Sequence, residues 1–201
     1  MKRILFTVLL LALAQMSMSA QKKNLDSKDT LFFVKEEGLY YAAIASKDIP
    51  PFDILSNHQI INYASCLKAI LQASGVKATY DEIIRKYLST SIDKQVVPLQ
   101  NRSKKIGGRK VVTTIIPQSE FDAQTIVNEL LKMQMMIVID KDGNVGLLTT
   151  IALSGGNGYQ PVYVRMRLPV LAKDEQRVQM SWKDFSLRVV TLVKVEIEKN
   201  E

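Results

Sequence analysis

The chain has a single cysteine, Cys66, and a single histidine, His58, and both fall within one short stretch that ends at Gly75. Cys66 follows Gln59 by seven residues and stands near the start of a segment whose apolar residues recur at helical spacing. A helix N-terminus lowers the pKa of a thiol, and the resulting thiolate attacks acyl carbon atoms. A neighbouring side-chain amide can donate a hydrogen bond to the oxyanion that forms. Cys66 is therefore the candidate nucleophile of a cysteine hydrolase, and Gln59 is the candidate oxyanion donor.

Cysteine catalysis also needs a base that accepts the thiol proton, and histidine is the usual one. His58 precedes Cys66 by eight residues and adjoins Gln59, which would put the base on the oxyanion side of the reaction. We interpret His58 as a loop residue with a solvent-exposed ring. Cys66 itself has two interpretations: it lines a cleft, or it packs as a small buried hydrophobe, as free cysteines often do.

Three helices are predicted around this stretch. The segment of Cys66 places apolar residues on one helical face and ends at Gly75. Thr79 and Glu82 form a capping box for a second, shorter helix. A further capping box at Ser119 to Asp122 begins a helix that reaches about Met133. The apolar sets of the first two helices are Tyr63, Cys66, Leu67, Ile70 and Leu71, then Tyr80, Ile83, Ile84 and Tyr87.

The second half of the chain reads as strands joined by turns. Apolar runs of strand length alternate with turn residues such as Asp142-Gly143, which favours left-handed backbone. Helices early and hairpin-connected strands late indicate an α+β fold with an antiparallel sheet. The predicted strands are 31–34, 39–45, 111–116, 135–139, 145–153, 161–168 and 187–197, with a short element at 181–185.

The N-terminal residues have the layout of a secretory signal peptide. Lys2 and Arg3 precede an apolar run from Ile4 to Ala14, and small residues follow. The run is shorter than the roughly 20 residues that a membrane span requires. We expect residues 1–20 to be removed near Ser19 or Ala20, 21–48 to form a leader and N-terminal strand region, and 49–201 to form the domain. The mature protein is then bacterial, secreted or periplasmic, and not inserted in a membrane.

Composition and motifs argue against several classes of site. One histidine and one cysteine do not build a usual zinc site, and the Asp140-Lys141-Asp142 segment lacks the later ligands of a calcium loop. The formal net charge is +7, and several basic residues lie in 102–110. Binding of single-stranded nucleic acid also requires aromatic side chains that stack on the bases, and no aromatic residue lies among these basic residues. We therefore expect no cofactor, no metal and no nucleic acid, and we expect a solvated turn at Gly107-Gly108.

The order of these segments resembles that of papain-like cysteine peptidases, in the branch of bacteriocin-processing and related bacterial peptidases. Gln59 to Gly75 and the helix that follows resemble the front half of the family. Met136 to Ile139, the turn, Gly143 to Leu148, Leu168-Pro169 and the Trp182 segment resemble the back half. The resemblance spans roughly residues 51–197. It implies a papain-like fold in which the Cys66 helix is central and packs on a C-terminal antiparallel sheet.

Two positions depart from the family pattern. The catalytic histidine of the family falls on Asn144, and the acid that orients it falls on Leu168. An asparagine amide has no nitrogen that titrates near neutral pH, so it cannot act as the base. The resemblance thus implies a secreted, catalytically degenerate papain-like protein that keeps a cleft for a peptide or protein ligand. Two alternatives stay open: an active cysteine peptidase or hydrolase with Cys66 as nucleophile, and an unrelated secreted α+β binding domain.

Overall fold

The computed structural model describes residues 34–36, 38–94, 96–155, 159–171 and 176–198. The predicted signal peptide, residues 1–20, lies outside the described residues, and so do residues 21–33 of the predicted leader and N-terminal strand region. Within the described ranges, no helix has the length and hydropathy needed to cross a membrane.

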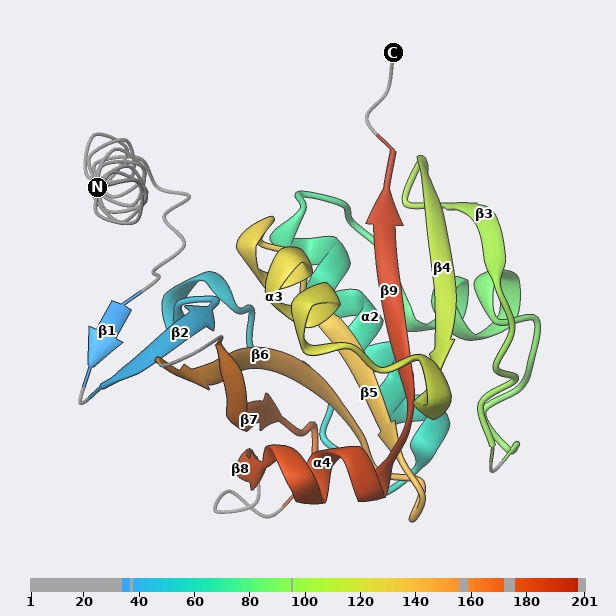
Figure 1. Cartoon of the computed structure of the whole chain (residues 1–201). Helices are drawn as coiled ribbons and strands as arrows, with labels where there is room; N and C mark the ends of the chain where they lie inside the picture. The colour runs from blue at the N-terminus through green and yellow to red at the C-terminus, as the bar shows by residue number, and fades with distance from the viewer. Residues whose placement is uncertain (1–33, 37, 95, 156–158, 172–175, 199–201) are drawn as a thin grey trace, which may run out of the picture. The chain divides into compact units, whose positions relative to one another are not determined.

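The described chain forms one antiparallel sheet with helices against it (Figure 1). The strands are β1 (Val34–Glu36), β2 (Leu39–Ala43), β3 (Arg102–Ile106), β4 (Arg109–Pro117), β5 (Met136–Asp140), β6 (Val145–Ser154), β7 (Gln160–Arg167), β8 (Arg177–Ser181) and β9 (Val189–Ile197). The helices are η1 (Ser46–Asp48), α2 (Gln59–Ala73), η2 (Glu82–Tyr87), η3 (Gln118–Glu120), α3 (Ala123–Leu131) and α4 (Trp182–Arg188). This confirms the α+β class, although the β1–β2 hairpin precedes the helices and the β3–β4 hairpin lies between them.

The strands pair in the order β1-β2-β6-β5-β9-β4-β3, and β7 and β8 extend the sheet from β6. The last strand, β9, lies between β5 and β4, so the C-terminal segment joins the two halves of the sheet. Every pairing is antiparallel, as the hairpin turns of the sequence predict.

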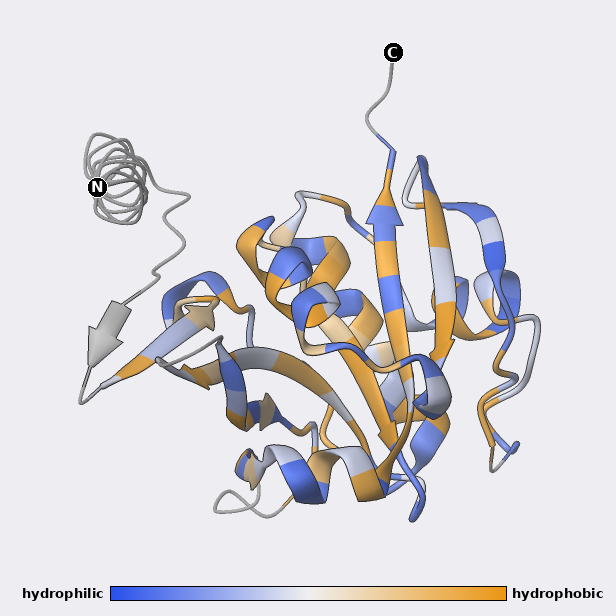
Figure 2. Ribbon diagram, in the orientation of Figure 1, coloured by the Kyte–Doolittle hydropathy of each residue, from blue (hydrophilic) through white to orange (hydrophobic). Residues whose placement is uncertain are grey.

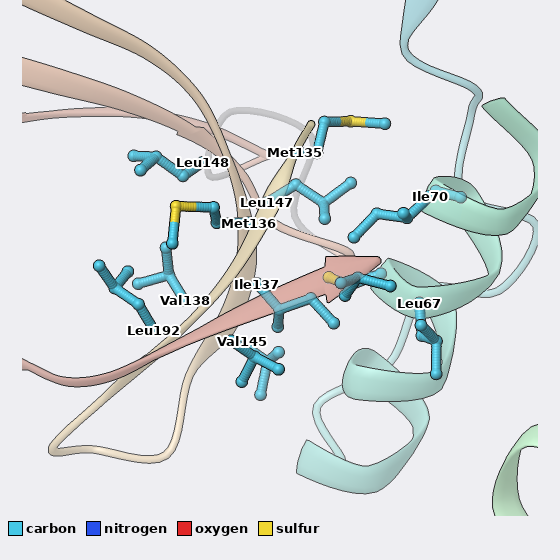
Figure 3. Close-up of a cluster of buried hydrophobic side chains, with 14 of the residues drawn as sticks. Leu67, Ile70, Met135, Met136, Ile137, Val138, Val145, Leu147, Leu148 and Leu192 are labelled. Atoms are coloured by element: carbon cyan, nitrogen blue, oxygen red, sulfur yellow. The ribbon is translucent and has the colours of Figure 1, made fainter. Parts of the chain in front are cut away.

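The central strands are buried on both faces. The first nine residues of β6 and the first four of β5 are all buried, so these strands do not show the alternation of a half-exposed strand. In Figure 3, Ile137 and Leu147 point toward Leu67 and Ile70 of α2, while Met136 and Leu148 point to the other side. α3 covers that second side (Figure 1). Hydrophobic residues are concentrated in this three-layered region (Figure 2).

The central helix begins earlier than the sequence predicts. α2 starts at Gln59, so Cys66 lies in its middle rather than near its first turn. The end is as predicted: Gly75 has φ +73°, a left-handed conformation that glycine adopts without steric cost. The early start removes the condition on which the predicted reactivity of Cys66 depends, because the effect of a helix N-terminus fades within the first turn.

The second helix is a short π-helical segment, η2, whose Leu88 amide donates to the Ile83 carbonyl at 2.8 Å. Its N-terminal bond is as predicted, because the Thr79 hydroxyl accepts from the Glu82 amide at 3.1 Å. The Glu82 carboxylate, however, accepts from the Gly107 amide at 3.0 Å. Glu82 therefore fixes the β3–β4 turn to η2 instead of closing the capping box.

β3 and β8, which the sequence pattern does not reveal, are both strands near the margins of the sheet. β3 reads Arg-Ser-Lys-Lys-Ile and has its three middle residues exposed. β8 alternates exposed and half-buried residues and pairs, among the described strands, with β7 alone. Charged residues at sheet margins prevent further strand pairing, and the same charges make these segments look like loops.

The helix α3 is capped by Asp122, and the prediction that Ser119 begins it is wrong. Pro117 precedes the short helix η3, so the chain turns once more before α3 begins. The Asp122 carboxylate then accepts from the amides of Gln124 and Thr125 at 3.2 and 2.9 Å. Both residues can act as caps, and only the path of the chain after Pro117 selects the second.

Replacing Asp122 with alanine should lower the free energy of unfolding by about 1 kcal/mol at neutral pH. The Thr125 amide bond, the largest cause, together with the Gln124 amide holds the pKa of Asp122 below its ordinary value of 3.8. Because the folded-state pKa is lowered, the charged Asp122 carboxylate stabilises the fold at pH values above 3.8. That stabilisation is lost as the pH falls through the lower folded-state pKa. Urea unfolding of both proteins at several pH values should show the difference shrinking in acid. A difference independent of pH would contradict the charged cap.

Candidate functional site

Cys66 is fully buried in the core and forms no disulfide. Burial raises the pKa of its thiol well above the ordinary value. A thiol with a raised pKa stays protonated at neutral pH, and the thiolate is the nucleophilic form. Cys66 therefore packs as a small hydrophobe in this structure, which is the second of the two interpretations that its sequence context allows.

Gln59 joins the first turn of α2 to two other segments. Its Oε1 atom accepts a hydrogen bond from the Val97 amide at 2.7 Å. Its Nε2 atom lies so close to the β5–β6 turn that a Cβ atom at Gly143 would be 3.2 Å from it. The side-chain oxygen is thus used to hold the segment before β3, and the side-chain nitrogen faces the turn that carries Asn144.

Asn144 is an exposed turn residue, and the Asp140 carboxylate holds it in place. Its amide donates to Asp140 Oδ1 at 2.8 Å, and its Nδ2 atom donates to Asp140 Oδ2 at 2.9 Å. Asp140 Oδ1 also accepts from the Asp142 amide at 2.9 Å. These bonds, with Gly143 at φ +84°, form the tight turn that the sequence predicts.

Of the three predicted site residues, Gln59 and Asn144 lie near one another and Cys66 lies deeper. Gln59 Nε2 lies 3.2 Å from the point where a Cβ atom of Gly143 would stand, and Gly143 directly precedes Asn144. Cys66 is seven residues farther along α2, a rise of about 10 Å at 1.5 Å per residue. The residues thus define a place where the start of α2 meets the β5–β6 turn, but the nucleophile position at that place is not Cys66.

His58 is the residue that precedes α2, and it is exposed, as the loop interpretation predicts. Its backbone amide donates to the Ser56 hydroxyl at 3.0 Å. Because Cys66 is fully buried and His58 faces solvent, the structure gives no support to a His58–Cys66 pair.

A groove of about 470 Å³ opens beside Asn144, and Leu168 also lines it. The two positions that depart from the family pattern are therefore brought to one cavity. Gly146 lies at its edge, and a Cβ atom there would meet the end of the Leu168 side chain and stand 3.0 Å from the Arg167 carbonyl oxygen. The apolar residues of the groove are Val138, Met166, Leu168, Val170, Val178, Met180 and Val189.

The rim of the groove is charged and polar. Arg188, at the end of α4, contacts Asp142 at 3.2 Å and Asp140 at 3.8 Å. Asn144, Gln179 and Arg177 also reach the rim. An apolar floor with a few polar groups at its edge is the usual composition of a ligand pocket. Sequence reasoning missed this groove because its walls come from β5, β7, β8 and α4, which only the tertiary fold brings together.

Arg102, one of the basic residues near the predicted Gly107-Gly108 turn, belongs to the core side of β3. Its side chain is buried, and its guanidinium donates to the carbonyls of Tyr87 and Pro98 at 3.1 and 3.4 Å. The turn itself is as predicted, with Gly107 and Gly108 at φ +54° and +79°. Arg102 therefore serves the fold by holding the chain between η2 and β3.

No group of three or more histidine, cysteine or acidic side chains within the described ranges is placed to hold a metal ion. Comparisons of the chain with family models, with curated proteins and with solved structures find no significant match. The function of this chain is accordingly inferred from the geometry of the site.

Proposed function

We propose that this chain is an exported, peptide-binding protein that has the papain-like fold without peptidase activity. Two observations carry the proposal: Cys66 is fully buried, and the open groove beside Asn144 and Leu168 has no described residue of α2 in its lining. A hydrolase of this class needs a thiolate and a base at the substrate, and here both positions hold groups that cannot take those roles. Binding is the function that such a site can keep.

The arrangement of α2 supports the papain-like part of the proposal. A buried helix packs on the centre of an antiparallel sheet, and its first turn meets the turn that precedes β6. The resemblance places the catalytic histidine of the family on Asn144, at that same turn. In this protein the meeting point holds two amide side chains, those of Gln59 and Asn144.

The chemistry of the groove supports a peptide as the ligand. Methionine and branched apolar side chains on its floor can receive apolar side chains of several shapes. The Asn144 amide and the Arg188 guanidinium at the rim have donors that suit peptide carbonyl groups. The described residues that line the groove include no cysteine, serine or threonine, so the proposed bound peptide stays intact.

Affinity selection from a synthetic library of random decapeptides tests this proposal. Peptides retained by the mature protein should be recovered with unchanged mass, and a selected peptide should bind in fluorescence anisotropy. Replacing Met180 on the groove floor with aspartate should weaken that binding by at least about tenfold, because an apolar contact worth about 1.5 to 3 kcal/mol is lost.

The matched control is Val162→Asp, which adds the same charge on the neighbouring strand β7, outside the groove. It should leave the affinity within about twofold. Peptides returned as cleaved fragments would show that the protein is a hydrolase. A failure to retain any peptide, or equal weakening by both substitutions, would overturn the peptide-binding proposal.

A further inference from the structure

Two arginines stand directly opposite each other in the β7–β8 ladder. Arg167 pairs with Arg177, and Arg165 pairs with Gln179 two residues away on the same face. Like charges in directly opposed positions destabilise an antiparallel pair. Because this pair does not stabilise the sheet, we consider a binding role for the two arginines.

No carboxylate of the described residues forms an ion pair with Arg165, Arg167 or Arg177. Arg165 donates instead to the Gln179 amide oxygen at 2.9 Å and to the Tyr163 hydroxyl at 3.2 Å. Arg167 donates to the Ile49 carbonyl at 3.2 Å. These neutral acceptors orient two of the guanidinium groups, but they do not neutralise them.

The β3–β4 hairpin gives a useful contrast. Lys105 and Lys110 are also directly opposed there, yet Lys110 forms an ion pair with Glu198 at 2.6 Å. The chain thus neutralises one like-charge pair with an acidic side chain. Among the described residues, it leaves the arginine pair on β7 and β8 without such a partner.

The three arginines line one cavity of about 310 Å³. The hydroxyl-bearing residues Thr149 and Thr150 form part of its wall, and both are buried. The register of β6 against β7 slips between Leu148 and Thr150, which places a β-bulge at the cavity. Bulges of this kind often lie next to binding sites, because they redirect side chains.

Arg167 is the most enclosed of the three arginines. Its guanidinium lies 5.5 Å from the centre of the Phe52 ring, and its side chain is half-buried. The pKa of Arg167 is lowered mainly by burial and secondarily by the nearby charge of Arg177. The Arg167 guanidinium nevertheless stays charged at every physiological pH. A partly desolvated positive charge of this kind favours an anion as its neighbour.

We propose that this cavity binds the phosphate or sulfate group of a small anionic ligand, with Arg165, Arg167 and Arg177 as its cationic contacts. Guanidinium groups form paired hydrogen bonds with tetrahedral oxyanions, and one such anion can contact opposed arginines together. The cavity volume lies at the lower end of the range for small-molecule sites, so it has room for an ester of the anion as well. The site differs in chemistry from the apolar groove, although the two share Met166, Arg177, Val178 and Gln179 in their walls.

Titration calorimetry with sodium phosphate and sodium sulfate, at constant ionic strength, tests the site on the mature protein. Either anion should bind the wild type, and the double variant Arg167→Gln/Arg177→Gln should bind it at least about tenfold more weakly. The control Arg85→Gln/Lys105→Gln removes the same charge from exposed positions elsewhere and should bind as the wild type does. Sodium acetate, a planar monoanion, should bind more weakly than either tetrahedral anion.

The source of the anion is distinguished with vesicles of phosphatidylglycerol. Binding to the free ions together with no enrichment on the vesicles supports a soluble ester, and enrichment that the double variant loses supports a phospholipid headgroup. Equal responses to acetate and phosphate, or equal affinities for the two double variants, would overturn the proposal. Because the probes are inorganic ions, phosphate binding without peptide binding would remove the proposed function and leave this site standing.

A measurement without any ligand keeps the proposal testable if the double variant folds poorly. Arg177 is exposed on β8, and the single change Arg177→Gln should raise the melting temperature by about 1 to 4 °C by removing the opposed charge. The same change should weaken anion binding. A lower melting temperature would show that Arg177 is held by a favourable contact, and it would contradict the inference of an unneutralised charge.

Discussion

Replacing Phe185 with alanine is expected to lower the free energy of unfolding by about 3 to 5 kcal/mol. The ring is fully buried, and it packs against two other aromatic rings. Its centroid lies 5.4 Å from that of Trp182, in a stacked arrangement, and 5.9 Å from that of Phe121. The substitution removes these contacts and leaves a cavity beneath α4, because a helix tethered at both ends cannot fully collapse into the space.

Leu187→Ala in the same helix is the matched control. Leu187 is 64% exposed, so its truncation removes little buried surface, and alanine has the higher helix propensity. Guanidinium unfolding should place this control within about 0.5 kcal/mol of the wild type. A loss below about 1 kcal/mol for Phe185→Ala would mean that α4 is not anchored by the aromatic cluster.

The anchoring of α4 also bears on the proposed ligand groove. Arg188 ends the helix and Val189 follows it, and both line the groove. The helix packs on β7 and β8, which supply much of the remaining wall. A loosened α4 should therefore weaken peptide binding, even under conditions in which the variant remains folded.

Much of the sheet could be predicted from the sequence because its central strands are apolar without interruption. The stretch from Met136 to Ile139, the turn with Gly143 and the long return strand β6 each combine a continuous buried run with a strong turn signal. Such segments carry their own signal, because burial on both faces excludes polar residues.

The boundaries that the sequence did not reveal depend on tertiary context. The sequence offers Ser56 and Asn57 as possible caps, but α2 begins after His58, whose side chain forms no capping bond. α2 begins there because the side-chain amide of Gln59 lies between the Val97 backbone amide and the β5–β6 turn. Both partners are distant from Gln59 in sequence. The strands β3 and β8 remained hidden because their exposed charged residues resemble those of loops.

The sequence singled out residues of the candidate site without their arrangement. Gln59 begins α2, and Asn144 and Leu168 line the edge of the groove. Whether Cys66 faced a cleft or the core could not be read from its spacing, because α2 is buried around most of its circumference. The charge pattern of β7 and β8 was equally hidden, since the pairing of Arg167 with Arg177 depends on the register.

The central claim is that Cys66 is a residue of the core and not a nucleophile. If so, the thiol reacts only when the protein opens, and natural domains populate unfolded forms at about 10⁻³ or less. Its raised pKa further reduces the thiolate available in the folded state. Labelling in the native protein is thus expected to be at least about 10³ times slower than in the unfolded chain.

The most direct test is the rate of iodoacetamide addition to Cys66 at pH 7.5, followed by intact-protein mass spectrometry with and without 6 M guanidinium. Because the chain has one cysteine, the single mass increment reports this thiol alone. We predict rapid labelling in the denaturant and a native rate at least about a thousandfold lower. Native labelling within tenfold of the denatured rate would place an accessible, reactive thiol at Cys66 and contradict the account.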